Sequence, residues 1–194
     1  MEIIKEKGRN WIKNKSRDKL TYTKIGSLNY LFYGKRISEQ SKYIKLGRFG
    51  EYFIKEFISL NNDFELMNCG IQKINNNNKD VDLIYKDNIN KIIYYRELKG
   101  NIELDTEKIP ATIDKCKEIN NYLKKEYNSY EINCGILNWS IYKREKTNLN
   151  IINKFEENEI KIEHFKDFLN IIGIEWEEQD FYEYFIELGK IFNN

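Results

Sequence analysis

Two β-rich runs, residues 81–86 and 91–98, are separated only by Asp87-Asn88-Ile89-Asn90. Runs of this length with so short a joint favour an antiparallel hairpin, because strands joined by a tight turn pair with each other. Since the hairpin is followed by a helical pattern and then by another strand-like run, it constrains the chain to helices packed on one sheet.

Helical periodicity precedes the hairpin. Residues 38–60 place large apolar side chains at three- and four-residue intervals, which predicts one long helix or two short helices, and Ser38 or Ser41 can cap the start. Residues 64–74 have the composition of a strand. The run from Asn75 to Asn78 favours a surface loop, because short polar side chains favour turns over regular structure.

A helix and a fourth strand follow the hairpin. Thr106 is a possible N-cap, Pro110 is tolerated in a first turn, and apolar residues then recur at helical spacing to about residue 126. Residues 131–142 again resemble a strand. Because a helix intervenes, this strand is expected to lie parallel to residues 91–98 through a right-handed crossover.

The predicted fold is therefore α/β (mixed α+β), in the order helix-strand-strand-strand-helix-strand. We expect a central mixed sheet of about four or five strands flanked by helices. Apolar residues form helical stripes within the acidic segments 153–172 and 178–192. This pattern predicts two acidic helices. No repeat or linker divides the 194 residues, so a single domain is expected, with these parts: a basic N-terminal segment at 1–44, a core at about 45–142, and acidic C-terminal helices at 153–194.

Composition excludes several classes of protein. Hydrophobic residues make up 41% of the chain, which is enough to build a core and argues against global disorder. The three cysteines lack metal-ligand spacing and the single His164 is remote from them, so neither a zinc site nor a disulfide framework is supported. Without a signal peptide or an apolar run of about 18 residues, we expect a soluble, cytoplasmic protein that does not associate with membranes.

The net charge of +1 conceals a strong polarity along the chain. Residues 1–50 carry 13 Lys or Arg against 4 Asp or Glu, whereas residues 155–194 carry 3 against 11. Basic residues interleaved with aromatic residues suit a polyanion such as nucleic acid. A solvated surface over core aromatics explains the same composition, so charge alone does not decide between the two.

The charged residues of the hairpin lie at its ends. Where one strand starts and the next ends, side chains become neighbours, so Asp82 and Glu97 are expected to converge at one edge of the sheet. Lys99 shares the face of Glu97 because strand side chains repeat every two residues, while Leu98 points to the opposite layer. Two converging carboxylates call for a cation, and Mg²⁺ prefers oxygen ligands, to which the Leu98 carbonyl can add.

An isolated Glu-x-Lys in a lysine-rich chain is more often a surface ion pair than a catalytic site. Here Asp82 stands fifteen residues before Glu97 across the predicted hairpin, and Glu51 lies on the preceding helix. This combination indicates a nuclease. Asp80 remains a rival for the metal, although Asp82 directly adjoins the apolar run.

With these residues the chain resembles the PD-(D/E)xK nuclease superfamily, and within it the type II restriction endonucleases. The resemblance covers about residues 45–142 and rests on Asp82, on Glu97-Leu98-Lys99 and on the segment Gly47-Arg48-Phe49-Gly50-Glu51. One departure is Val81, which stands where the family motif has proline. The resemblance implies that Asp82 and Glu97 bind Mg²⁺, that Lys99 assists the attacking water, and that Glu51 supports a second ion or an ordered water.

The resemblance also implies partners and products. We expect sequence-specific double-strand cleavage of DNA to 5′-phosphate and 3′-hydroxyl ends by a homodimer, whose two-fold symmetry would match a palindromic site. A cognate DNA methyltransferase is the expected functional companion. Two alternatives remain: a repair or junction-specific nuclease of the same fold, and a noncatalytic DNA-binding protein.

Candidate DNA contacts come mainly from the basic segment. An Arg or Asn from that segment or from residues 138–148 is a candidate for reading base edges. The segment 101–108 is a further candidate, although a capped helix entrance is the favoured interpretation of it. The candidate residues are Arg9, Lys13, Lys15, Arg17, Lys19, Lys35, Arg36, Asn101 and Lys108.

Overall fold

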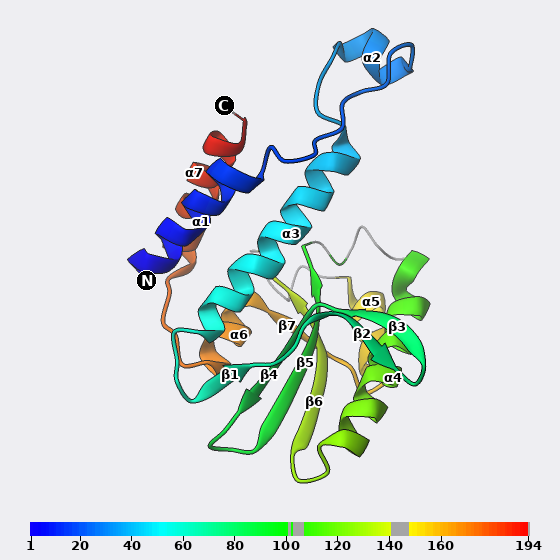
Figure 1. The fold of residues 1–194 in the computed structure, drawn as a ribbon, viewed down its shortest axis with the longest axis vertical. Coiled ribbons are helices and arrows are strands. Elements are labelled where there is room, and N and C mark those ends of the chain that lie inside the picture. Colours follow the sequence, from blue (N-terminus) through cyan, green and yellow to red (C-terminus); the bar gives the residue numbers. More distant parts are fainter. Residues whose placement is uncertain (101, 103–106, 141–147, 194) are drawn as a thin grey trace.

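The computed structural model describes residues 1–100, 102, 107–140 and 148–193. A five-stranded mixed sheet lies at the centre, in the order β1-β4-β5-β6-β7, and a separate two-stranded hairpin is formed by β2 and β3 (Figure 1). The predicted α/β class with a mixed central sheet flanked by helices is confirmed. The strands are β1 (Phe64–Leu66), β2 (Gly70–Ile74), β3 (Asn77–Val81), β4 (Leu83–Asp87), β5 (Ile92–Lys99), β6 (Glu131–Asn138) and β7 (Lys161–His164).

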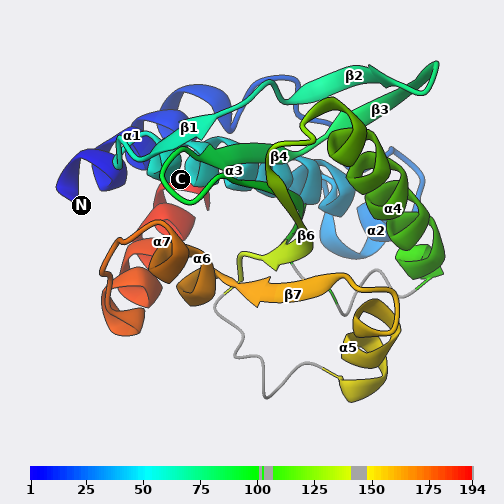
Figure 2. The same ribbon diagram turned by 90° about the horizontal axis from the view of Figure 1, so that it is seen from below.

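Helices cover both faces of the sheet. In Figure 2 the sheet separates α3, α1, α6 and α7 from α4 and α5. The helices are α1 (Glu2–Lys15), α2 (Leu28–Tyr33), α3 (Glu39–Ile58), α4 (Ile109–Glu126), α5 (Leu149–Glu156), α6 (Phe165–Ile171) and α7 (Glu178–Asn193). Among the described residues, no helix is both long enough and apolar enough to cross a membrane.

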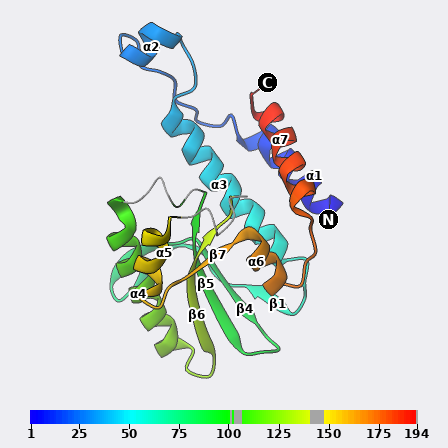
Figure 3. The same ribbon diagram turned by 180° about the vertical axis from the view of Figure 1, so that it is seen from behind.

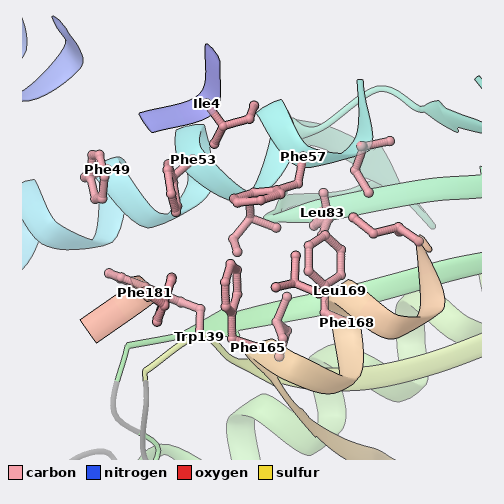
Figure 4. Packing of buried hydrophobic residues seen from close by; sticks show 14 of the residues in the cluster. Ile4, Phe49, Phe53, Phe57, Leu83, Trp139, Phe165, Phe168, Leu169 and Phe181 are labelled. Carbon is pink, nitrogen blue, oxygen red and sulfur yellow. The ribbon is translucent and has the colours of Figure 1, made fainter. Parts of the chain in front are cut away.

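Helix α3 matches the helix predicted at residues 38–60. Its N-cap is Ser38, whose hydroxyl accepts a hydrogen bond from the Ser41 backbone N–H. Phe49, Phe53 and Phe57 lie on one side of the helix at four-residue intervals and are fully buried. They pack on α6 and α7 residues in a continuous aromatic cluster (Figure 4).

The hairpin and the crossover also match the prediction. Strands β4 and β5 pair antiparallel, and β5 pairs parallel with β6 after the intervening α4. Alternate residues of β5 enter two different apolar clusters: Tyr94 and Leu98 belong to the α3 side, whereas Ile93 and Tyr95 belong to the α4 side. The period-two alternation of a strand thus separates the two layers of the core.

Two sequence-based expectations about the strands were wrong. Residues 64–74 form not one strand but two, because β1 pairs with β4 whereas β2 turns away to pair with β3. Asn75 and Asn76 do form the expected turn, with positive φ angles of 48° and 69°, a conformation that asparagine tolerates better than most residues. Asn77 and Asn78, however, are exposed residues at the start of β3.

The C-terminal region also differs from the expected pair of acidic helices. Residues 153–172 contain the end of α5, strand β7 and helix α6. The strand is stabilised by a partner that helical periodicity cannot reveal, since β7 lies parallel beside β6 at the edge of the sheet. Helix α7 forms where a helix was expected at 178–192. Figure 3 shows α6 and α7 on the face of the sheet that α3 covers.

The N-terminal segment has two parts of opposite character. Helix α1 packs beside α7, with Ile4 buried in the aromatic cluster and the Tyr184 hydroxyl donating to the Lys5 carbonyl at 2.9 Å. Helix α2 lies in an arm, residues 20–37, that projects beyond the N-terminal end of α3 (Figure 1). No residue of α2 is buried, and the arm exposes Ile25, Leu28, Leu31, Phe32 and Tyr33.

Candidate active site at the end of strand β5

The register of the β4–β5 hairpin positions the predicted carboxylates. Leu83 is paired with Arg96, so Asp82 and Glu97 occupy the next position on each strand. Asp82 precedes β4 and accepts a hydrogen bond from the Leu98 backbone N–H at 2.8 Å through Oδ2. The structure therefore brings Asp82 alongside Glu97 at the edge where β5 ends.

A lysine from α4 joins the two carboxylates. The Lys115 Nζ lies 2.5 Å from Glu97 Oε2 and 3.6 Å from Asp82 Oδ1. Lys99 Nζ approaches the other Glu97 oxygen at 3.4 Å, and the Tyr95 hydroxyl donates to Glu97 Oε2 at 3.0 Å. We call Asp82, Glu97, Lys99 and Lys115 the rim cluster.

The rim cluster is largely screened from water, which strengthens the electrostatic interactions between its charged groups. The side chains of Glu97, Asp82 and Lys115 are 8%, 16% and 21% exposed. Burial is the main cause that raises the pKa of Asp82, to about 7, and the charge of Glu97 adds to it; the Lys115 ammonium and the Leu98 N–H act in the opposite direction. Burial alone would lower the pKa of Lys115, but the charges of Asp82 and Glu97 hold it above its usual value.

Leu98 points away from the rim cluster, as the alternation of strand side chains predicts. Its side chain packs against the apolar cluster on the α3 side. Its backbone N–H is already used by Asp82. The proposed contribution of its carbonyl as a metal ligand stays a prediction.

Glu51 approaches the rim from α3 but does not join it. Burial is the main cause that raises the pKa of Glu51, with a further contribution from the charge of Asp80, while Lys55, Arg48 and Lys115 oppose the rise. The nearest cation is Lys55, whose Nζ lies 4.0 Å from Glu51 Oε2. Glu51 is thus within electrostatic reach of the site, as its interaction with Lys115 indicates.

A glycine allows α3 to lie close to the rim. A Cβ atom added at Gly50 would lie 2.4 Å from the indole ring of Trp139, the residue that follows β6. The absence of a side chain at Gly50 therefore permits the contact between α3 and Trp139, and Glu51 is the next residue. A Cβ atom added at Gly47 would meet no atom within 4 Å, so Gly47 does not share this role.

The structure separates the rival Asp80 from Asp82. Asp80 is exposed within β3 and is paired with Ile71 in the hairpin. Asp82 is instead partly buried and contacts both β5 and α4. This placement favours Asp82 as the carboxylate of the rim cluster.

Sequence reasoning missed Lys115. The helical pattern placed α4 correctly but treated it as a connection, and Lys115 adjoins the buried Cys116 on its sheet-facing side. A lysine next to the apolar stripe of a helix that follows an acidic strand end was the available signal. It was weak because α4 carries several other lysines.

The donor atoms of the rim cluster suit a hard divalent cation. Two carboxylates already share one positive charge, the Lys115 ammonium, and Mg²⁺ is commonly held by one or two carboxylates together with phosphate oxygens. Across the parts of the chain that are described, no three Asp, Glu, His or Cys side chains gather closely enough to hold a metal by themselves. The fit is therefore to a site in which the two carboxylates Asp82 and Glu97 meet, and a role for Glu51 toward a metal stays a prediction.

The predicted DNA contacts fall into distinct groups. Arg9 donates to Glu187 at 2.7 Å and to Glu2 at 2.8 Å, so the structure gives it the role of holding α1 against α7. This placement argues against a role for Arg9 in DNA contact. Within the candidate segment 101–108, Asn101 and residues 103–106 lie outside the described residues. The same holds for residues 141–147.

The other basic candidates are better placed for a large anion. Exposed side chains follow the chain from the end of α1 toward the arm: Lys13, Lys15, Arg17 and Lys19. Within the arm, Lys35 lies over the Tyr22 ring at 5.3 Å and Arg36 over the Tyr33 ring at 4.3 Å. Lys108, also exposed, precedes α4.

Comparison with known proteins adds no assignment. Neither a scan against protein-family models nor a search of curated proteins finds a match for this chain. Any functional conclusion thus depends on the residues of the rim cluster.

Proposed function

We propose that the protein is a Mg²⁺-dependent endonuclease of duplex DNA, of the type II restriction kind. The supporting observation is that Asp82, just before β4, and Glu97, in β5, share one cation at the edge of the sheet while Lys99 lies beside Glu97. Structural ion pairs seldom place two partly buried carboxylates against each other, because their repulsion is costly without a cation.

The acidic and basic residues of the rim cluster would have different roles in cleavage. Asp82 and Glu97 would hold Mg²⁺, which when bound supplies positive charge at the scissile phosphate and lowers the pKa of water. Lys99 is 17% exposed and would face the phosphate, where its ammonium neutralises charge that develops on the phosphate oxygens. Tyr95 fixes the Glu97 carboxylate through its hydroxyl. Glu51 would act from α3 through an ordered water or a second ion.

The basic candidates are arranged to receive a duplex at this end of the sheet. Glu51 is twelve residues from the start of α3, so the arm begins about 18 Å further along the helix axis. Lys13, Lys15, Arg17, Lys35 and Arg36 would contact phosphates along this path. A homodimer would apply one rim cluster to each strand of a palindromic site.

The acidic C-terminal region fits this orientation. Helix α7 packs on α1 and on the aromatic cluster, on the same side of the sheet as α3. Because its acidic residues would repel phosphates, DNA would not approach over α7. Cys69, Cys116 and Cys134 are free thiols, which fits a reducing cytoplasm, where a companion methyltransferase would protect host DNA.

Cleavage by point variants tests the proposal. Purified protein is incubated with genomic DNA and Mg²⁺, and the fragments are resolved on a gel. We expect discrete, reproducible fragments from the natural protein, and a loss of cleavage of at least about a hundredfold in Asp82→Asn, Glu97→Gln and Lys99→Met, since each removes a charge beside the phosphate. Asp80→Asn is the matched control and should cut normally.

The remaining outcomes separate the alternatives. Cutting that depends on branched or damaged DNA would support a repair nuclease instead. Binding of DNA without cleavage, unchanged in the three variants, would support a noncatalytic DNA-binding protein and would refute the nuclease.

A further inference from the structure

The Lys115 ammonium lies between the carboxylates of Asp82 and Glu97. A metal ion bound there would neutralise the same two negative charges. Its Nζ contacts one oxygen of Glu97 and one of Asp82, at 2.5 Å and 3.6 Å. Of these two carboxylates, Lys99 is paired with Glu97, at 3.4 Å. Lys115 is therefore the one charge in the rim cluster that joins both acidic side chains.

The place of Lys115 on α4 allows its side chain to move without disturbing the sheet. The residue lies in the middle of α4, whose buried side is anchored by Ile109, Thr112, Cys116, Ile119 and Leu123. Its ammonium is carried on a flexible four-carbon stem and is 21% exposed. The head can thus turn toward solvent while the helix remains packed.

We propose that Lys115 is a displaceable internal counter-ion of Asp82 and Glu97. It holds the two carboxylates together in the metal-free protein, leaves when a divalent cation binds, and by this competition weakens the affinity of the site for the cation. The inference rests on the proposed function, since it concerns the same two carboxylates.

Metal titration of a charge-removing variant tests the competition. In Lys115→Met, which keeps most of the stem, we expect Mg²⁺ to bind at least about tenfold more tightly in isothermal titration calorimetry, because a unit charge a few ångströms away no longer opposes it. Thermal unfolding in chelator should occur at a lower temperature than in the natural protein, and saturating Mg²⁺ should raise the unfolding temperature more in the variant.

The matched control is Lys117→Met on the same helix. Lys117 is exposed and its Nζ donates to the Asn158 side chain, away from the rim cluster. Its Mg²⁺ affinity should equal that of the natural protein. Equal or weaker Mg²⁺ binding in Lys115→Met would overturn the proposal.

A measurement on the natural protein does not depend on the folding of any variant. Acetylation by an amine-reactive ester is followed by mass spectrometry, with and without saturating Mg²⁺. We expect modification of Lys115 to increase several-fold when Mg²⁺ binds, while that of Lys117 stays constant. Unchanged modification of Lys115 in the metal-bound protein would refute displacement.

The two proposals fail in different ways. If the natural protein cleaves DNA with Mg²⁺ but Lys115 shows neither effect, only the counter-ion role is wrong. If Mg²⁺ does not bind at all and Asp82→Asn has no effect on cleavage, both are wrong.

Discussion

Arg96 and Glu97 are neighbours in β5, and each belongs to a cluster of charged side chains. The two clusters lie on opposite faces of the sheet. Arg96 is fully buried on the α3 side and pairs with Glu163 of β7 through two nitrogens, with an Nε–Oε2 distance of 2.7 Å. It also donates to the Tyr95 and Asn133 carbonyls and to the Asn133 side chain. An arginine has five N–H donors, and all of them are used here.

The rim cluster is built differently. The Lys115 ammonium lies 2.5 Å from one Glu97 oxygen, but the contacts of Lys99 with Glu97 and of Lys115 with Asp82 are longer, at 3.4 Å and 3.6 Å. The two carboxylates also repel each other. The Arg96–Glu163 pair is thus a closed arrangement with matched donors and acceptors, whereas the rim cluster sets two mutually repelling carboxylates against longer cation contacts. Two buried charge clusters on one strand thus differ in how completely their hydrogen bonds are matched, not in burial alone.

The largest expected effect would come from breaking the closed pair. Arg96→Met leaves Glu163 buried without a partner and frees the Asn133 groups, so the free energy of unfolding should fall by about 3–5 kcal/mol. Urea denaturation followed by circular dichroism measures the change. The double variant Arg96→Met with Glu163→Leu should recover much of the loss, and a loss in the single variant below about 1 kcal/mol would contradict the assigned structural role.

An effect of opposite sign is expected in the rim cluster. Because folding raises the pKa of Asp82 to about 7, the folded protein retains a proton that the unfolded chain has released, and metal-free stability should fall as pH rises from about 4 to 7. Asp82→Asn removes this dependence. The natural protein should therefore lose stability relative to the variant by up to about 1.4 kcal/mol per pH unit in this window.

Urea unfolding in chelator at several pH values measures this difference. Asp63→Asn, at an exposed position before β1, is the control and should follow the natural protein. A variant no more stable than the natural protein at pH 8 would mean that the Asp82 charge is already fully compensated.

The smallest expected effect concerns the hydroxyl that orients Glu97. Tyr95→Phe removes one hydrogen bond to a carboxylate while the buried ring remains, so the unfolding free energy should fall by about 1–2 kcal/mol. Cleavage should fall less than in Glu97→Gln, because the ligand is still present. A loss of cleavage as large as that of Glu97→Gln would show that Tyr95 acts on the substrate itself.

Sequence patterns predicted the parts of the molecule that depend on local periodicity. The alternation of residues 91–98 correctly placed Glu97 and Lys99 on one face with Leu98 on the other. The three-four spacing of the aromatic residues gave α3, and the short joint after Asp87 gave the hairpin. In each case the residues that decide the structure are close together in sequence.

Features that depend on distant partners escaped prediction. Strand β7 exists because β6 offers it an edge and Arg96 offers Glu163 a partner 67 residues away. Lys115 belongs to the rim cluster only because α4 packs across β5 and β6. The break between β1 and β2 likewise depends on which neighbour each strand pairs with, and composition does not encode that choice.

The projecting arm has a consequence for how such a chain can change over generations. Since α2 contributes no buried residue to either apolar cluster, substitutions and length changes within residues 20–37 leave the packing of the sheet untouched. Under the proposed function, the arm could therefore acquire a new binding preference while the rim cluster keeps its residues, so that recognition and cleavage would evolve as separable traits of one small protein.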